Sequence, residues 1–370
     1  MKSKQVVHEL LKQADIKVGG TRPWDITVHD ERLYVRVLKY HVLGLGEAYM
    51  DGWWDSPNLD ETFSKVIAAR LGDKVKLRPS LLLAGLEASL RNHQTVKQAK
   101  KNAEHHYNIG NDLYAAMLDE RMVYSCGYWR DARNLDEAQE QKLDLICRKL
   151  ELKKGMRVLE IGCGWGGFLE YAAKNYGIKG VGITPALEQA KIARQRLKGF
   201  DVKIEQKDYR QVTGKFDRII SIGMFEHVGP KNYRKFFEVC DERLASGGMM
   251  LHHTIGGNVN ATNADPWMRK YIFPHGVIPG MGQIVSAIEG LFVIEDLHNF
   301  GPDYDKTLMA WHENFNRNYS KLSAEYDERF KRMWNFYLTL SAASFRERDQ
   351  QLWQVVMRRI EPSPAYRGVR

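Results

Sequence analysis

From residue 155 onward, the chain alternates short β-rich runs with segments of helical pattern. The runs read, in order, MRVLEIG, IKGVGIT, VKIEQKD, FDRIISIG, GGMMLHHTI and LFVIEDLHNF. Strands that alternate with amphipathic helices build a mostly parallel sheet with helices on both faces. The pattern therefore predicts a doubly wound α/β domain. A long helical stretch, RFKRMWNFYLTLSAASFRERD, precedes a last run, LWQVVMRR, which can add one further strand.

The first 100 residues follow a different pattern, with helical segments interrupted by glycine-rich turns. Asp60 is a candidate cap for a helix that begins near Glu61. The later segment RNHQTVKQAKKNAEHHY is polar and basic with few apolar anchors, which is the composition of a hinge or an exposed helix. We therefore predict a helix-rich domain over residues 1–90, a basic linker over 91–104 and the α/β domain over 105–370.

Composition indicates a packed globular protein with an anionic partner. The apolar share is 44%, which is enough for a large core, and the formal net charge is +9. This charge suits a phospholipid surface or a nucleic acid, and charge alone does not choose between them. The four cysteines contain no C-x-x-C pair, so we expect neither a metal centre nor a disulfide framework, and a reducing cytoplasm fits.

Nothing in the sequence predicts a membrane-spanning segment. The first twenty residues, MKSKQVVHELLKQADIKVGG, lack the continuous apolar region of a signal peptide and resemble an amphipathic helix. No stretch reaches the roughly 20 apolar residues that cross a bilayer. We therefore expect any membrane contact to be peripheral.

A glycine cluster after the first strand of the α/β domain predicts a nucleotide-type site. In VLEIGCGWGG, a strand precedes Gly162 and Gly164, and a helix is expected to start near Phe168. Glycines let the backbone approach a ligand, and the helix N-terminus offers unpaired N–H groups. The spacing departs from G-x-G-x-x-G, and an acid before the first glycine, Glu160, is typical of S-adenosylmethionine sites. The alternative is a tight turn without a ligand.

The ends of the next two strands offer further candidates for that cofactor. The second strand ends in Thr184 instead of the acid that often holds a ribose, so ribose recognition is assigned to Gln189. The third strand ends at Asp208 and Tyr209, where a carboxylate and a ring can receive an adenine. The alternative for Asp208 is a helix cap.

The fourth strand runs into SIGMFEHVGPKNY, which places Glu226 and His227 where ligands bind in open α/β sheets. For Glu226 the alternative is a helix-terminus carboxylate or a surface ion pair. We expect structural roles for His227 and for His252, the first of two adjacent histidines on the next strand.

Several long segments together resemble bacterial cyclopropane fatty acid synthases, and the match covers nearly the whole chain. They are GLGEAYMDGWW, HYNIGNDLYAAML, YSCGYW, VLEIGCGWGG, GMFEHVGPKNY, LHHTIG, DPWMRKYIFPHG and FGPDYDKTLMAW. The resemblance implies a class I S-adenosylmethionine-dependent methyltransferase (Rossmann-like) domain preceded by a smaller lipid-engaging domain. It also implies a homodimer, a cis double bond in a phospholipid acyl chain as the acceptor, and bound bicarbonate.

The resemblance also assigns site residues, motif by motif. Those implied to hold bicarbonate are Cys126, Glu226, His253, the Ile255 backbone and Tyr304. Those implied to bind the cofactor are Tyr124, Ser125, Gly162, Gly164, Gln189 and the Asp208–Tyr209 corner. Small departures from the family pattern, at Pro185, Ala186 and His275, concern cofactor and chain specificity more than the reaction.

The chemistry explains these residue types. An alkene is a poor nucleophile, so it needs an activated sulfonium donor, and methyl transfer leaves a carbocation. A weak, well-placed base then removes a proton from the new methyl group and the ring closes. Glu226 suits the proton of bicarbonate itself. No covalent enzyme intermediate is needed, so we do not expect Cys126 to be a nucleophile. The alternative to its assigned role is a merely buried thiol. Trp53 and Trp54 suit either lipid contact or the core.

We therefore expect a cytoplasmic enzyme, attached peripherally to the inner membrane, that cyclopropanates unsaturated phospholipids. One alternative is a related lipid C-methyltransferase that yields a methyl-branched or methylenated chain. A second alternative, motivated by the charge, is a noncatalytic lipid- or nucleic-acid-binding protein. The intact set of Glu226, His253 and Tyr304 favours an enzyme, and we expect no nucleic-acid partner.

Overall fold

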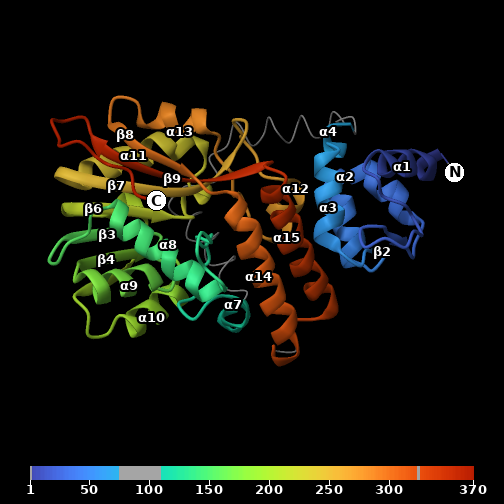
Figure 1. The fold of residues 1–370 in the computed structure, drawn as a ribbon, viewed down its shortest axis with the longest axis horizontal. Coiled ribbons are helices and arrows are strands. Elements are labelled where there is room, and N and C mark those ends of the chain that lie inside the picture. Colours follow the sequence, from blue (N-terminus) through green and yellow to red (C-terminus); the bar gives the residue numbers. More distant parts are fainter. Residues whose placement is uncertain (1, 75–109, 323–325) are drawn as a thin grey trace.

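The computed structural model describes residues 2–74, 110–322 and 326–370 of the chain (Figure 1). A helical unit formed by the first of these ranges lies beside a larger α/β unit. The linker expected over 91–104 lies outside the described residues, so the domain boundaries stay a prediction.

The α/β unit is built on one seven-stranded sheet with the order β5-β4-β3-β6-β7-β9-β8. The strands are β3 (Arg157–Ile161), β4 (Lys179–Thr184), β5 (Val202–Gln206), β6 (Phe216–Ile222), β7 (Leu244–Gly257), β8 (Phe292–Asn299) and β9 (Gln350–Arg359). Strand β9 pairs antiparallel with β7 and β8, and the pairs among β3 to β7 are parallel. All seven strands expected from the sequence are confirmed, including the last one.

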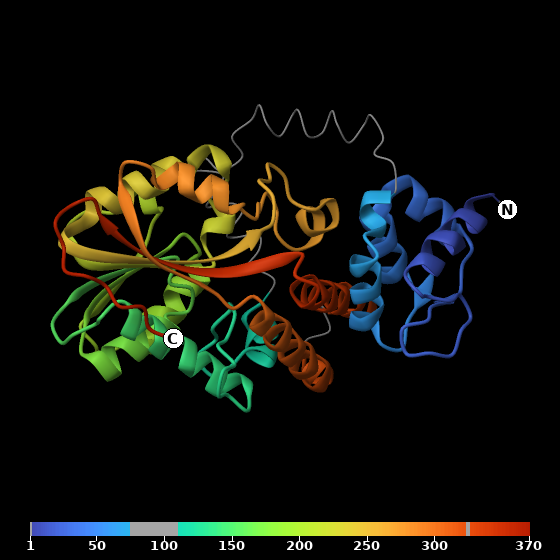
Figure 2. The ribbon, with the colours of Figure 1, turned by 45° about the horizontal axis from the view of Figure 1, so that its top comes forward.

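Helices cover both faces of this sheet (Figure 2). They are α8 (Leu135–Lys149), α9 (Gly167–Tyr176), α10 (Leu187–Arg196), α11 (Tyr233–Arg243) and α13 (Met281–Ile288). The remaining helices of this unit are α7 (Asn111–Met117), α12 (Pro266–Tyr271), α14 (Pro302–Asn318) and α15 (Glu328–Arg346), and α14 and α15 lie between the sheet and the helical unit (Figure 1). Apolar side chains of α8, α9 and α10 form one core with the sheet, and those of α11 and α13 form another. This is the doubly wound arrangement that the alternating pattern predicts.

The helical unit contains four helices and a two-stranded ribbon within residues 2–74. These elements are α1 (Lys2–Gln13), β1 (Thr27–Val28), α2 (Arg32–Met50), β2 (Trp54–Asp55), α3 (Leu59–Ala68) and α4 (Leu71–Lys74). Trp54 is buried in the core and donates from its indole to the Leu45 carbonyl, which settles it as a core residue.

The expected cap at Asp60 is wrong. Helix α3 begins at Leu59, with Asn58 at the capping position, so Asp60 lies inside the first turn. Its carboxylate instead forms an ion pair with Arg346 of α15, at 2.8 Å. The local pattern predicted that the Asp60 carboxylate binds the backbone of α3, but it binds Arg346 of the other unit.

Aromatic packing joins the two units. Phe336 of α15 contacts Phe63 of α3, with ring centroids 4.9 Å apart, and Trp267 of α12, at 4.5 Å. Helix α2 approaches this cluster at Gly46, where an added Cβ atom would lie 2.4 Å from the Trp267 indole nitrogen. Only glycine allows this close approach.

The substitution Gly46→Ala tests the packing. In an exposed helix, replacing glycine with alanine stabilises the fold by about 1 kcal/mol. Here the added methyl group must displace Trp267, which destabilises the fold by about 1 to 3 kcal/mol. Gly72→Ala is the control, because nothing lies within 4 Å of its Cβ position. In thermal unfolding we expect G46A to melt below, and G72A at or above, the parent protein. Equal melting temperatures for the two variants would contradict the tight contact.

Candidate functional site

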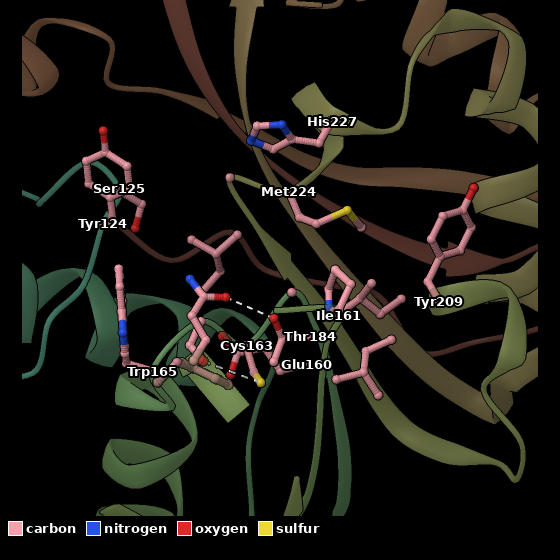
Figure 3. Close-up of a pocket in the computed structure, with 18 of the residues that line it drawn as sticks. Tyr124, Ser125, Glu160, Ile161, Cys163, Trp165, Thr184, Tyr209, Met224 and His227 are labelled. Atoms are coloured by element: carbon pink, nitrogen blue, oxygen red, sulfur yellow. Dashed lines mark hydrogen bonds between the residues drawn. The ribbon is translucent and has the colours of Figure 1, made fainter. Parts of the chain in front are cut away.

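A cavity of about 160 Å³ opens at the carboxyl ends of β3, β4, β5 and β6 (Figure 3). All eight side chains or glycines assigned to the cofactor line it. They are Tyr124, Ser125, Glu160, Gly162, Gly164, Gln189, Asp208 and Tyr209. Four separate parts of the chain thus meet at the place where open α/β sheets bind nucleotides.

Within the turn after β3, backbone geometry most clearly requires glycine at position 162. Gly162 has φ of 84°, and a Cβ atom there would lie 2.7 Å from Cγ of Met224 in the neighbouring turn. Helix α9 then begins at Gly167, one residue before the expected start. The glycines therefore leave space for a ligand at the carboxyl end of β3.

Glu160 places a buried carboxyl group in this cavity. Its side chain is buried, and no described residue gives a hydrogen bond to Oε2. Burial raises the pKa of Glu160 to about 8, and the nearby Lys142 charge acts in the opposite direction. A buried carboxylate without a full set of donors favours a ligand that brings a cation or N–H groups.

The other polar contacts of the cavity are partly used within the protein. Thr184 donates to Gln189 Oε1 at 2.9 Å, which orients that amide. Asp208 accepts from the backbone and guanidinium of Arg210 and caps the short helix Tyr209–Gln211. The capping alternative for Asp208 is therefore realised, and a contact to adenine stays a prediction.

A second cavity, of about 1150 Å³, lies against the first. The two cavities share four wall residues, namely Tyr124, Ser125, Gly223 and His227. The larger cavity continues between apolar side chains of both units, including Val37 and Leu45 of α2 and Phe336 and Leu340 of α15. Its volume and this apolar part of its lining suit a long apolar chain.

Glu226, His253, Ile255 and Tyr304 line the larger cavity, so the structure brings together four of the five residues assigned to the anion. Glu226 Oε1 accepts from the Ile255 amide at 2.7 Å, and Oε2 has no partner among the described residues. Burial raises the pKa of Glu226 to about 7, and the Ile255 hydrogen bond opposes this shift. The Ile255 amide thus holds the carboxylate.

His253 supplies a neutral imidazole. Burial holds its pKa well below the usual value. The Gln354 amide nitrogen lies 3.3 Å from Nδ1, so Nδ1 accepts and the proton resides on Nε2. Nε2 is buried and has no partner among residues 2–74, 110–322 and 326–370. Glu226 thus brings a hydrogen-bond acceptor, and His253 a donor, to the wall of the larger cavity.

Cys126 does not line either cavity. Its thiol is fully buried and donates to the Gly127 carbonyl at 3.1 Å. Burial raises the pKa of Cys126 far above the usual value, so the thiol stays protonated. A protonated thiol is a poor nucleophile. All four cysteines are free, and within the described ranges no group of His, Cys, Asp or Glu is arranged to hold a metal ion.

Comparison with known proteins identifies the family. Residues 94–355 match the family described as mycolic acid cyclopropane synthetase. The chain belongs to this family.

Curated relatives agree with this assignment. The cyclopropane-fatty-acyl-phospholipid synthase of Escherichia coli (strain K12) is 50% identical over 96% of this chain and 93% of its own. The tuberculostearic acid methyltransferase UfaA1 of Mycobacterium tuberculosis is 33% identical over 88% of this chain and 81% of its own.

Solved structures place the fold. The mycolic acid cyclopropane synthase CmaA1 with SAH and CTAB gives a TM-score of 0.66 at 30% identity, over 70% of this chain and 97% of that one. The cyclopropane synthase MmaA2 of Mycobacterium tuberculosis gives 0.65 at 28%, with the same coverage. The α/β unit is therefore a class I S-adenosylmethionine-dependent methyltransferase domain, as expected.

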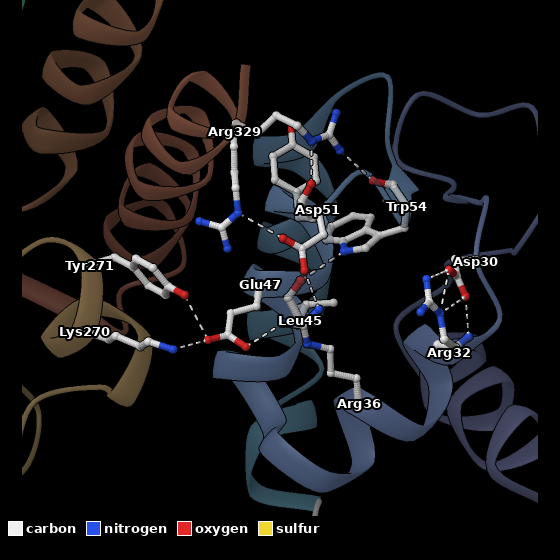
Figure 4. A network of polar contacts seen from close by, with 12 residues as sticks. Asp30, Arg32, Arg36, Leu45, Glu47, Asp51, Trp54, Lys270, Tyr271 and Arg329 are labelled. Atoms are coloured by element: carbon white, nitrogen blue, oxygen red, sulfur yellow. Dashed lines mark hydrogen bonds and ion pairs between the residues drawn. The ribbon is translucent and has the colours of Figure 1, made fainter. Parts of the chain in front are cut away.

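In this family member, ion pairs connect the two units that enclose the larger cavity. Acids of the helical unit face bases of the methyltransferase domain throughout: Glu47 with Lys270, Asp51 with Arg329, Asp55 with Arg332 and Asp60 with Arg346. Figure 4 shows Lys270 and Tyr271 converging on Glu47. Although burial opposes it, hydrogen bonds from Lys270, Arg36 and Tyr271 lower the pKa of Glu47 to about 2.

Sequence reasoning missed two features of the site. His227 lines both cavities, although its expected role was structural. Its position directly after Glu226 in the sequence could have indicated a place in the site. Lys142 is fully buried on α8 and donates to Ser125 Oγ at 2.9 Å. Its sequence context, AQEQKLDL, gives no sign of burial.

The adjacent histidines of β7 provide a matched test, because neighbouring strand residues face opposite sides of a sheet. His252 packs between Phe225 and Phe237, and neither ring nitrogen has a partner among the described residues. We expect His252→Leu to keep turnover and to leave stability unchanged or raised by about 1 kcal/mol. His253→Leu should lose roughly 100-fold in turnover. Equal losses of turnover would refute the division of roles.

Proposed function

We propose that this enzyme transfers a methylene group from S-adenosylmethionine to the cis double bond of an unsaturated phospholipid acyl chain and forms a cyclopropane ring. The observation that carries the proposal is the pair of cavities that meet at Tyr124 and Ser125. One has the lining of a cofactor site. The other is larger, has an extended apolar part between α2 and α15, and includes Glu226, His253 and Tyr304 in its wall.

The smaller cavity is assigned to S-adenosylmethionine, whose sulfonium supplies the activated methyl group. Ionised Glu160 would hold the ammonium of the methionine part. Because Gly162 and Gly164 lack side chains, the cofactor can approach the backbone of the turn closely. Gln189 and the Asp208–Tyr209 corner would receive the ribose and the base. These residues would bind the cofactor and orient it so that its sulfonium faces the wall shared with the larger cavity.

The larger cavity is assigned to the acyl chain, with its double bond beside that shared wall. Aromatic side chains there, Tyr124 and Tyr304 among them, exclude water from a developing carbocation. Each well-placed ring face also stabilises the cation by roughly 0.5 to 2 kcal/mol. Exclusion of water matters because water would capture the cation as an alcohol.

The polar spot of the larger cavity fits bicarbonate, which would supply the base for ring closure. The fit rests on complementary atoms: Glu226 Oε2 accepts the one acidic proton, and His253 Nε2–H donates to an oxygen. Because the Ile255 amide already binds Glu226, it acts by fixing that carboxylate. A neutral His253 and an ionised Glu226 together hold an anion without quenching its basicity.

Membrane attachment is proposed to involve the helical unit. Within the described ranges no helix is long and apolar enough to cross a bilayer. Residues 1–74 contain eleven Lys and Arg and eleven Asp and Glu, so their formal charge is zero. Exposed apolar side chains on α1 and α2, namely Val6, Val35 and Tyr40, are the better candidates for lipid contact.

The excess positive charge lies beyond residue 74 and would add a salt-sensitive contribution. A homodimer in the cytoplasm, working at the inner membrane, completes the proposal on the strength of the family resemblance.

The chemistry is tested by incubating the protein with S-adenosylmethionine and cis-unsaturated phospholipid vesicles, with and without bicarbonate. Mass analysis should show a gain of one CH₂ and loss of the double bond, and activity should fall when bicarbonate is removed. Glu226→Gln should lower turnover by about 100-fold or more while it keeps affinity for S-adenosylhomocysteine. A mass gain with a retained double bond, or a saturated methyl-branched product, would favour the C-methyltransferase alternative.

The pH dependence follows from the raised pKa of Glu226. The ionised form accepts the proton of bicarbonate, so turnover should rise as pH increases through about 7. A flat profile between pH 6 and 8 would remove this carboxylate from the rate-determining chemistry.

Membrane contact is tested by vesicle co-sedimentation with a pair of matched variants. Val35 is 59% exposed on α2, and Val293 is 48% exposed on β8 of the methyltransferase domain. We expect Val35→Glu to weaken vesicle binding several-fold at both low and high salt, because a charge opposes apolar insertion. Val293→Glu should leave binding unchanged. Equal effects would place the contact elsewhere.

A further inference from the structure

Two buried polar side chains of α8 reach the segment that separates the two cavities. Gln139 Nε2 donates to the carbonyls of Ser125, at 2.7 Å, and Val123, at 3.3 Å. One helical turn later, Lys142 Nζ donates to Ser125 Oγ at 2.9 Å. Both side chains are 0% exposed. Because removing an ammonium from water is costly, such a lysine needs compensating partners.

Two buried carboxylates compensate Lys142 electrostatically. Asp119 is already engaged, since it accepts from the amides of Val123, at 2.7 Å, and Arg121, at 3.2 Å. Glu160 has an oxygen without a partner among the described residues. When both carboxylates are ionised, two negative charges face one lysine, so the site is one positive charge short. An ammonium that arrives with a ligand completes the balance.

The other titratable groups around this pair are uncharged. Burial raises the pKa values of the thiols above their usual range and lowers that of the histidine, so they stay neutral; these groups are Cys126, Cys147, Cys163 and His253. Burial lowers the pKa of Lys142 to about 8, and Asp119 is the largest influence that opposes this shift. Lys142 is therefore the cation whose charge acts on Glu160.

We propose that Lys142 is a positioning residue for methylene transfer: it fixes Ser125 in the shared wall and favours the ionised form of Glu160, which receives the ammonium of the cofactor. This rests on the proposed assignment of S-adenosylmethionine to the smaller cavity. Lys142 lines neither cavity itself, so it acts through the two residues that do.

The test is calorimetric titration of S-adenosylhomocysteine between pH 6 and 9. Glu160 binds an ammonium only when it is ionised, so affinity rises as pH increases through the pKa of Glu160. Lys142→Met removes the charge that favours ionisation, so this pKa rises further. We expect weaker binding near pH 7, recovery at higher pH, and a midpoint shifted upward by about one unit or more. Lys142→Arg keeps the charge and should stay near the parent profile.

Lys149 offers a matched control on the same helix. It is also 0% exposed, but its Nζ lies 3.3 Å from Asp296 and 3.1 Å from His298 Nδ1, and it lines neither cavity. Lys149→Met removes an equally buried charge and should leave the midpoint unchanged. Ser125→Ala removes the hydroxyl acceptor and keeps the charge, so it should also retain the parent midpoint while it lowers turnover.

The outcomes separate the claims. A parent protein that fails to bind S-adenosylhomocysteine at any pH would defeat the cofactor assignment itself. If the parent binds and K142M follows the parent profile, or if K149M shifts the midpoint equally, the role of Lys142 is overturned. Lys142→Gln repeats the test if K142M does not fold. Failure of both neutral variants to fold, while K149M folds, would assign Lys142 to stability and likewise overturn the proposal.

Discussion

Two carboxylates are removed from water at the carboxyl ends of neighbouring strands, and the rest of the site depends on that burial. Glu160 is the penultimate residue of β3 and Glu226 follows β6, at the point where the strand order reverses. A buried carboxylate costs several kcal/mol unless it is paired, so each must gain a partner or become protonated. The raised pKa values of both groups express this cost. Ligand binding is the natural source of the missing partners.

The larger cavity exists because two units close around it. Ion pairs of this exposure contribute at most about 1 kcal/mol each, so the four between the units cannot alone hold them together. Aromatic contacts of Phe336 with Phe63 and Tyr49 of the helical unit add apolar stabilisation to these ion pairs. The ion pairs instead fix the orientation, since every acid lies on one unit and every base on the other. That orientation keeps an apolar path open between α2 and α15.

Sequence pattern predicted the strands because buried parallel strands need continuous apolar runs, whatever lies around them. The same reasoning found Glu160 and Glu226, since the ends of such strands are fixed by the fold. It failed at Asp60, whose partner Arg346 is distant in sequence and near only after folding. Lys142 was missed for the same reason: a lysine in a polar helical segment is normally solvated, and only tertiary packing against Ser125 buries it.

The shared wall at Tyr124 and Ser125 is the central claim, because methylene transfer requires both ligands to meet there. The most direct measurement is an experimental structure with S-adenosylhomocysteine and an unsaturated phospholipid bound together. The account predicts the cofactor at Glu160 and Gly162, with the acyl chain running from α2 past Phe336 so that its double bond lies beside Glu226. An acyl chain bound outside the larger cavity, or a double bond separated from the cofactor sulfur by the wall, would contradict it.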